Sequence, residues 1–282
     1  MYRVTHPAFA IAGSVALSCL LLSSAPASAA DDCDTIRRAL SSVIGTTDIW
    51  TSLKRALKAS VAADPNNGPT NGGFDLNMWG TIVARDGKVC AVAFSGGDTG
   101  EQWPGSRVIS AQKANTANSF SLPGLALSTA NLWAATQPGG SLFGLQESNP
   151  IDTSVAYEGP FADFGTSTDK MVGEKIGGLN VFGGGLALYT DGTLLGGLGV
   201  SGDSSCADHN VAWRVRDALE LNSVPGGVGS PADNIIYDVK SAQRGPAPGN
   251  NTISASGFGH PECGGTEPAV NAEIVAGFGS GS

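Results

Sequence analysis

The stretch that decides the fold is Leu186-Ala-Leu-Tyr-Thr190, then Asp191-Gly192, then Thr193-Leu-Leu-Gly-Gly-Leu-Gly-Val200. The two outer runs are typical of strands, and Asp-Gly between them is a strong signal for a tight hairpin turn. The segment Ser201–Ser205 then opens a helix that we expect to run from Ala207 to Leu221, because apolar residues recur along one face of it. This stretch predicts an antiparallel strand pair followed by a helix.

The same pattern occurs earlier in the chain. Trp79–Arg85 and Lys88–Phe94 flank Asp86-Gly87, for which we expect a type I′ turn. Between the two hairpins, helices are predicted at Ser106–Phe120 and near Ser128–Thr136. Two hairpins interleaved with helices predict an α+β domain, in which helices cover an antiparallel sheet.

The remaining segments surround this pattern. Helical periodicity over Cys33–Ala63, interrupted at Gly45-Thr46-Thr47, predicts a further pair of helices. Pro138–Gly178 is mostly turn material, and its length suggests a lid or an assembly surface. After Asn222 the chain is rich in Gly, Pro, Asn and Ser; only Ile235–Val239 is strand-like, and we expect the last residues to be frayed.

The composition excludes several classes of protein. Gly contributes 40 of 282 residues and charged residues 15%, against usual shares of about 7% and about 25%. Hydrophobic residues make up 41%, which is enough for a core and excludes a disordered acidic chain. The glycines have no G-X-Y period, which excludes collagen. The net charge of −9 and the lack of a basic cluster argue against a nucleic-acid partner.

Residues 1–29 are predicted to be a secretory signal peptide. Arg3 is followed by an apolar run from Phe9 to Leu22, and Ala27-Ser28-Ala29 fits the A-x-A cleavage pattern. The run is shorter than the roughly 20 residues that a membrane span needs. We therefore expect a secreted or periplasmic protein without a membrane span in the mature chain.

If the protein is exported, its cysteines are expected to form disulfides. Cys33, Cys90, Cys206 and Cys263 remain after cleavage, and an even number in an oxidising compartment suggests two disulfides. Four cysteines allow three pairings; our prediction is Cys33 with Cys90 and Cys206 with Cys263. The cysteines are too far apart for a C-x-x-C metal site, and no metal site is predicted.

Two enzyme motifs do not fit this sequence. Gly197-Leu-Gly-Val-Ser-Gly202 spells G-x-G-x-x-G, but the strand before it is a hairpin arm and no parallel partner follows the helix, unlike a dinucleotide-binding unit. We expect these small residues to allow close packing of helix on sheet. The chain has no G-x-S-x-G, and only His209 and His260 remain after cleavage, which argues against a serine hydrolase.

Three polar residues are candidates for a site. Lys113 and Thr116 lie at i and i+3 on one helix face, either as part of a small-residue packing face with a snorkelling lysine or as a polar pair lining a pocket. His209 is expected to be a surface or capping residue, and the alternative is an axial ligand or a base. We expect His260 to be structural.

Together these segments resemble the GlcG/HbpS family of heme-binding (heme-degrading) domains. Lys113-Ala-Asn-Thr-Ala117 matches the family's K-A-x-T-A helix, and Gly183–Gly202 matches its glycine-rich hairpin ending in G-x-G-V-S-G. Asp208 and Ala212 match the D-x-x-x-A of its closing helix, so that the resemblance covers roughly Asp34–Leu221.

The resemblance implies an α-β-α layered domain at 30–221 that forms homo-oligomers and binds heme or a related small ligand. Lys113 and Thr116 would contact that ligand, and we add Ser201 and His209 as further candidates. Some exported members act in heme or redox stress. The chain departs from the pattern in its longer loop at 122–179, its four cysteines and a Gly/Pro-rich extension at 222–282, which we expect to pack on the domain.

The first hypothesis is therefore an exported protein that binds heme or another tetrapyrrole. A second is an oligomeric interaction module without a ligand. A third is an enzyme acting on a small organic substrate, with Lys113 as a base.

Overall fold

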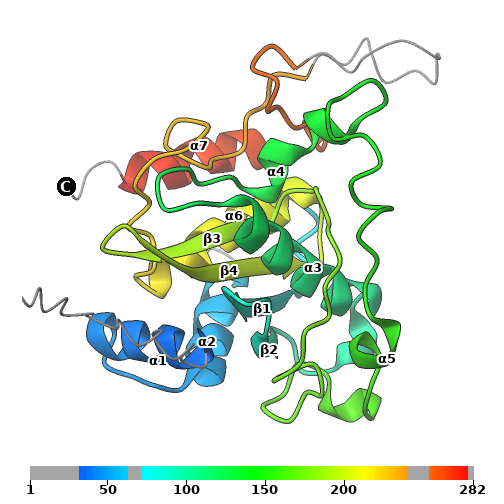
Figure 1. Ribbon diagram of the computed structural model, residues 1–282, viewed down its shortest axis with the longest axis vertical. Coiled ribbons are helices and arrows are strands. Elements are labelled where there is room, and N and C mark those ends of the chain that lie inside the picture. Colours follow the sequence, from blue (N-terminus) through cyan, green and yellow to red (C-terminus); the bar gives the residue numbers. More distant parts are fainter. Residues whose placement is uncertain (1–31, 63–70, 240–253, 279–282) are drawn as a thin grey trace, which may run out of the picture. The chain divides into compact units, whose positions relative to one another are not determined.

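In the computed structural model, which describes residues 32–62, 71–239 and 254–278, four strands form one antiparallel sheet (Figure 1). They are β1 (Trp79–Ala84), β2 (Val89–Phe94), β3 (Gly185–Thr190) and β4 (Thr193–Ser201), in the order β2-β1-β4-β3. Each predicted hairpin forms one half of the sheet, and β1 pairs with β4 to join the halves. The predicted antiparallel sheet is confirmed.

The two Asp-Gly turns differ. Asp191 and Gly192 both have positive φ, at 47° and 72°, as a type I′ turn requires. In the first hairpin Gly87 has φ 84° but Asp86 does not have a positive φ, and the Gly87 N–H donates to the Ala84 carbonyl. The predicted type I′ turn at Asp86-Gly87 is wrong, because this loop is one residue longer and ends in a left-handed glycine.

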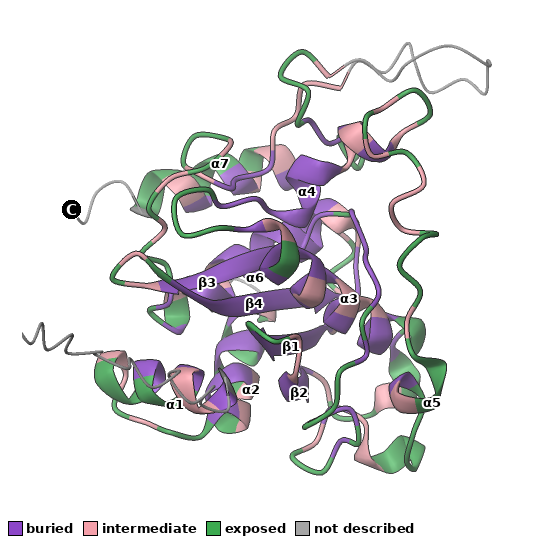
Figure 2. Ribbon diagram, in the orientation of Figure 1, coloured by how far each residue is buried: buried purple, intermediate pink, exposed green. Residues whose placement is uncertain are grey.

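Helices cover both faces of the sheet. α3 (Gly105–Phe120) packs on one face, while α1 (Asp32–Val43), α2 (Ile49–Val61) and α6 (Ser205–Ala218) share an apolar core with the other. The sheet between them is almost entirely buried (Figure 2). The predicted helices at the N-terminus, at 106–120 and after β4 are confirmed, and the layers run α-β-α.

Close contact between α3 and β4 depends on glycine. A Cβ at Gly199 would lie 1.9 Å from the carbonyl oxygen of Ser110, and one at Gly197 would lie 2.2 Å from that of Ala114. The alanines that α3 turns toward the sheet, Ala111, Ala114 and Ala117, are fully buried. The expected small-residue packing is therefore present, with α3 as the helix that uses it.

A long connection joins α3 to β3. It contains only short elements: α4 (Thr129–Leu132), η2 (Ala134–Thr136), α5 (Thr153–Ala156) and η3 (Phe161–Asp163). A buried ion pair between Arg107 of α3 and Asp169 fastens it to the domain, with Arg107 Nε 2.8 Å from an Asp169 oxygen. One further short element, η1 (Thr99–Glu101), follows β2.

The C-terminal extension differs from the expectation in two ways. Ile235–Val239 is not a strand, since only Val239 forms an isolated bridge, with Ser254. The last residues are not frayed throughout, because α7 (Glu267–Phe278) packs against α6. Its Asn271 is buried and donates to Asn210 of α6, so tertiary contacts stabilise a helix that composition alone obscures.

Both predicted disulfides are confirmed. Cys33 joins Cys90 at a Cα–Cα distance of 5.5 Å, and Cys206 joins Cys263 at 6.0 Å.

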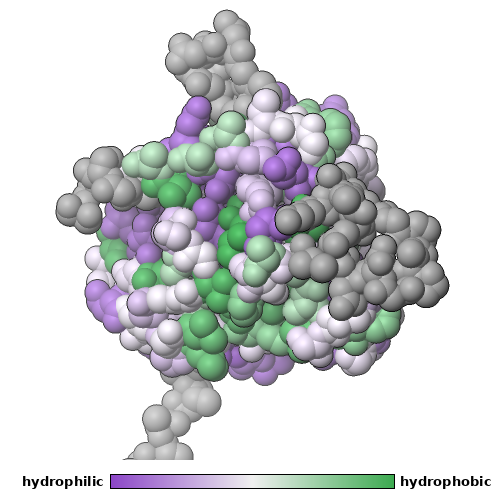
Figure 3. All heavy atoms as spheres, turned by 90° about the horizontal axis from the view of Figure 1, so that it is seen from above, coloured by the Kyte–Doolittle hydropathy of each residue, from purple (hydrophilic) through white to green (hydrophobic). Residues whose placement is uncertain are grey.

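Within the described ranges, no helix is both long and apolar enough to cross a membrane. The predicted signal peptide at 1–29 lies outside these ranges. On the face seen in Figure 3, apolar residues are scattered among polar ones.

Candidate functional site

Lys113 takes part in a buried ion pair. Its Nζ lies 2.7 Å from Oδ2 of Asp208 on α6 and 3.2 Å from the Val200 carbonyl oxygen, and both charged side chains are 2% exposed. Asp208 Oδ1 also accepts from the Asp203 N–H. Burial raises the pKa of Asp208 to about 6, and the Lys113 ammonium opposes that rise. The lysine does not snorkel to the surface; it links α3 to α6 beneath the end of β4.

Thr116 is also enclosed. Its hydroxyl donates to the Gln112 carbonyl oxygen at 2.7 Å and accepts from the Asn180 N–H at 2.9 Å. The side chain is fully buried. Thr116 therefore fixes the end of the long connection against α3.

His209 lies in the core, so the expectation of a surface or capping histidine is wrong. Its Nε2 accepts from the Ile235 N–H at 3.2 Å, which places the ring proton on Nδ1, and Nδ1 has no hydrogen-bond partner among the described residues. Burial lowers the pKa of His209 to about 3. The extension covers this histidine, which the local sequence could not show.

Ser201 is buried at the end of β4, opposite Trp79 in the sheet. The four predicted residues thus lie on α3, β4 and α6, and none of them lines either of the two cavities described below. Their contact with a ligand stays a prediction.

The larger cavity, which we call the aromatic cleft, has a volume of about 450 Å³. Its walls come from three separate parts of the chain: α2, the loop after β2, and the η3 region of the long connection. The side chains that give it its character are Lys54, Phe94, Asp98, Phe161 and Phe164. Its volume falls within the range of about 300–1,000 Å³ that is usual for ligand pockets.

Two of the phenylalanines that line the cleft are held in place by neighbouring side chains. The Phe94 ring packs on Trp79 with centroids 4.6 Å apart, and the Arg107 guanidinium lies 3.7 Å from the centroid of Phe164. Phe161 meets Phe164 edge-on at 5.7 Å and is 47% exposed. The cleft therefore has two phenylalanines fixed in its wall and one accessible ring at its mouth.

The charged groups of the cleft sit at its rim. Lys54 is half-buried, with Nζ 5.0 Å from the centroid of Trp50, whose Nε1 donates to the Gly165 carbonyl oxygen. Asp98 accepts from the Gly100 N–H at 2.8 Å. Lys54 thus extends from α2 into the cleft, opposite the long connection, where it can meet an anionic group of a ligand.

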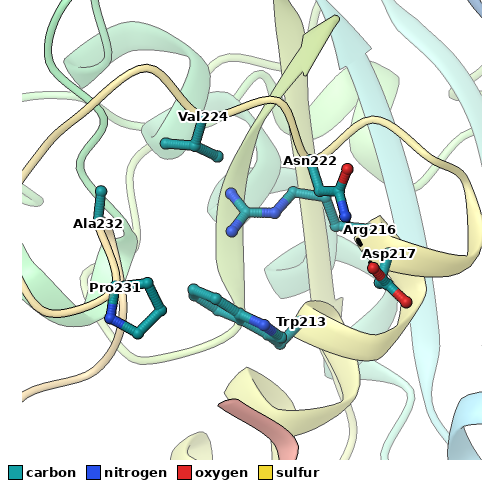
Figure 4. A pocket seen from close by; sticks show the side chains of 7 residues that line it. All are labelled: Trp213, Arg216, Asp217, Asn222, Val224, Pro231 and Ala232. Carbon is teal, nitrogen blue, oxygen red and sulfur yellow. Dashed lines mark hydrogen bonds between the residues drawn. The ribbon is translucent and has the colours of Figure 1, made fainter. Parts of the chain in front are cut away.

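The smaller cavity, of about 260 Å³, lies between α6 and the extension (Figure 4). Arg216 points into it beside Trp213, but its guanidinium is paired with the buried Asp233, with Nη2 2.8 Å from Oδ1. Asp217 accepts from Asn222 at 2.7 Å at the edge. Because the charges are already paired, this cavity offers few free polar groups for a ligand.

The aromatic cleft is not predictable from the sequence. Its residues are distant in sequence, so no local spacing connects Lys54 with Phe94 and Phe161. The length of the connection after α3 was the available signal, since long structured loops commonly carry function.

Comparison with known proteins gives one family. The sequence matches the model of the family described as haem degrading protein HbpS-like over residues 75–216. No curated protein matches the chain.

Three solved structures resemble the fold. A complex of PduOC with heme is 22% identical, with a TM-score of 0.42, and the match covers 62% of this chain and 94% of that one. The Klebsiella pneumoniae protein ORFY, of family DUF336, is 22% identical, with a TM-score of 0.39 and coverage of 61% and 90%. HbpS is 17% identical, with a TM-score of 0.36 and coverage of 61% and 89%.

Proposed function

The chain belongs to the HbpS-like family of haem-degrading proteins, and on this premise we propose that it binds a tetrapyrrole such as heme in the aromatic cleft. The observation that carries the proposal is a cleft of about 450 Å³ that combines three phenylalanines with Lys54. A porphyrin presents a flat apolar ring and carboxylates along one edge. The cleft supplies partners for both features.

The ring would lie against the phenylalanines. Aromatic side chains favour offset or edge-on contact with flat rings. Phe94 and Phe164 are already fixed by Trp79 and Arg107, so little side-chain freedom is lost on binding. Phe161, the exposed ring, would cover the ligand from the mouth.

The carboxylates would meet Lys54. Charge-assisted hydrogen bonds between an ammonium and a carboxylate are stronger than neutral ones. The Trp50 ring holds Lys54 near the mouth. The lysine would then fix which edge of the ring faces α2.

The cleft fits the iron of heme less well than it fits the porphyrin ring and its carboxylates. Heme iron is usually held by His, Cys, Met or Tyr, and none of these lines the cleft. The carboxylate of Asp98 and the hydroxyls of Thr99 and Thr166 are the oxygen groups there. When bound, heme would supply a redox-active iron, while this chain would hold the ring and its carboxylates. We therefore propose that affinity depends little on the iron.

Parallel titrations with hemin and with metal-free protoporphyrin test this proposal. Binding is followed by the Soret band and by quenching of tryptophan fluorescence. We expect the two ligands to bind within about tenfold of each other. Phe161→Ala should weaken both by about tenfold, because roughly half of a phenylalanine side chain's burial, worth up to about 1.5 kcal/mol, is lost. Lys54→Gln should also weaken both.

Matched controls come from the same elements. Phe143→Ala removes another exposed ring of the long connection, and Lys58→Gln removes the lysine one turn further along α2. Neither residue lines the cleft, so neither should change affinity. The proposal fails if Phe161→Ala and Lys54→Gln bind hemin as well as the natural chain. If Thr116→Ala alone abolishes binding, the ligand belongs at the predicted Lys113–Thr116 pair instead.

We further propose that the protein acts outside the cytoplasm, as a homo-oligomer, in the response to heme or redox stress. Two disulfides support export, since such bonds persist in oxidising compartments. Mass spectrometry of the protein recovered from the periplasm or medium should find Ala30 as its first residue. An intact Met1 in that fraction contradicts the predicted cleavage.

A further inference from the structure

Two cysteines and a histidine meet where the C-terminal segment joins α6. Cys206 lies in the first turn of α6, while His260 and Cys263 belong to residues 254–278. The two Sγ atoms and an imidazole nitrogen all lie within 4.8 Å of one another. In the structure the cysteines form a disulfide. Three ligand atoms of the kinds that zinc prefers thus converge from two separate segments.

The spacing suits a tetrahedral metal once the sulfurs separate. Bonds of about 2.3 Å from zinc to sulfur place two sulfur ligands about 3.8 Å apart. Cys206 Sγ already lies 3.9 Å from His260 Nδ1. The site therefore needs rotation of the two freed cysteine side chains and release of Nδ1 from the Pro261 carbonyl oxygen.

His260 is suited to be the third ligand. Its imidazole is buried directly beside Cys206, so it needs no large movement to join the two sulfurs. Nδ1 lies 2.7 Å from the Pro261 carbonyl oxygen, and Nε2 lies 3.3 Å from the Ser205 hydroxyl. In the oxidised protein Nε2 also accepts from the Gly183 N–H at 3.4 Å. Coordination through Nδ1 would release the contact with Pro261 and move the ring proton to Nε2, where the Ser205 hydroxyl takes over from Gly183 as its partner.

A reductant can reach this disulfide more easily than the other one. Cys263 is exposed, whereas Cys33 and Cys90 are both buried. Thiol–disulfide exchange requires direct attack on a sulfur, so access determines which bond reacts first. The Cys206–Cys263 bond is the one open to exchange.

Other contacts keep the two segments together after reduction. Glu267 of α7 accepts from the Ser204 hydroxyl at 2.7 Å, directly before α6. Asn271 of α7 donates to Asn210 of α6 at 3.0 Å. The two thiols would therefore stay next to each other and next to His260.

We propose that reduction of Cys206–Cys263 creates a binding site for a divalent, thiol-binding cation such as Zn²⁺, held by Cys206, Cys263 and His260. A dithiol supplies the two electrons: it becomes a cyclic disulfide, and the protein gains two thiols. The cation then displaces both thiol protons, and water fills the fourth position. The metal takes over the link between α6 and the extension that the disulfide provides in the oxidised protein.

Cobalt titration of the full mature chain tests the proposal. A phosphine reductant is used because it cleaves disulfides without adding thiols that compete for metal. The reduced protein should bind one equivalent of Co²⁺ with thiolate-to-cobalt charge-transfer absorption and the visible bands of a tetrahedral site. Added Zn²⁺ should displace the cobalt. Cys263→Ser should abolish the charge-transfer bands, and His260→Ala should weaken binding at least tenfold.

The second disulfide provides the internal control. In the reduced natural chain, Zn²⁺ should protect Cys206 and Cys263 from alkylation, read by mass spectrometry, and leave the reactivity of Cys33 and Cys90 unchanged. This measurement needs no variant. The proposal is overturned if the oxidised chain gives the same cobalt spectrum, if Cys263→Ser retains it, or if reduction unfolds the protein and zinc neither refolds it nor protects the two cysteines.

Discussion

Acidification should destabilise the protein through His209. This imidazole is fully buried, and its Nε2 accepts from the Ile235 N–H. His260, Arg216 and Lys113 are the charged or titratable groups whose fields act on it, and all three disfavour a further positive charge. The folded state therefore keeps His209 neutral, while the unfolded chain binds a proton there.

The magnitude follows from the difference in pKa. Burial lowers the pKa of His209 from 6.5 to about 3. The stabilisation by the neutral ring is present above pH 6.5 and is lost as the pH falls from 6.5 toward 3, at about 1.4 kcal/mol per pH unit. Between pH 7 and pH 4.5 this amounts to a loss of about 2.5 kcal/mol.

The assay compares the natural chain with His209→Gln, whose amide oxygen can still accept from Ile235. Urea unfolding at pH 7 and pH 4.5, followed by circular dichroism, gives the free energy of unfolding for each protein. Other groups titrate equally in both, so the natural chain should lose about 2.5 kcal/mol more than the variant. If both proteins lose the same free energy, His209 does not titrate as a buried neutral group, and the reasoning is refuted.

Three further outcomes are expected. Gly199→Ala should destabilise the fold by about 3 kcal/mol in thermal or urea unfolding, because the new methyl group would overlap the backbone of α3; Gly124→Ala, with no atom within 4 Å of the new group, should have almost no such steric cost. Lys113→Met should cost about 3 kcal/mol by leaving Asp208 buried without its partner, and adding Asp208→Leu should recover most of that loss. Light scattering on the mature protein should give a multiple of the chain mass, and a monomer mass would contradict the expected homo-oligomer.

The fold was predictable where the signals are local. Alternating apolar runs around Asp86-Gly87 and Asp191-Gly192 identified both hairpins, and their order with the helices gave the layers. The type of the first turn was not predictable, because loop length and not the dipeptide sets the φ of Asp86. Thr266 directly precedes α7, and Thr266-Glu-Pro is a helix-start signal that the surrounding Gly-rich composition obscured.

The site was less predictable because it is assembled by tertiary contacts. Lys54 and Phe161 belong to segments whose proximity depends on how the long connection folds back over the end of β2. His209 was misjudged for a related reason: the residues around it suggest an exposed helix start, but Ile235 and its neighbours cover it. Local periodicity contains no information about which distant segment covers a helix.

The buried ion pairs explain how the long connection and the C-terminal extension are attached to the helices. Charged residues are scarce, at 15%, yet three pairs among the described residues are buried: Arg107–Asp169, Lys113–Asp208 and Arg216–Asp233. One joins α3 to the long connection, one joins α3 to α6, and one joins α6 to the extension. A buried pair adds little net stability compared with apolar packing, but a segment docked without its partner leaves an unpaired charge at a cost of about 3–5 kcal/mol. The pairs therefore determine where the connection and the extension dock, and the same docking forms the wall of the aromatic cleft and covers His209.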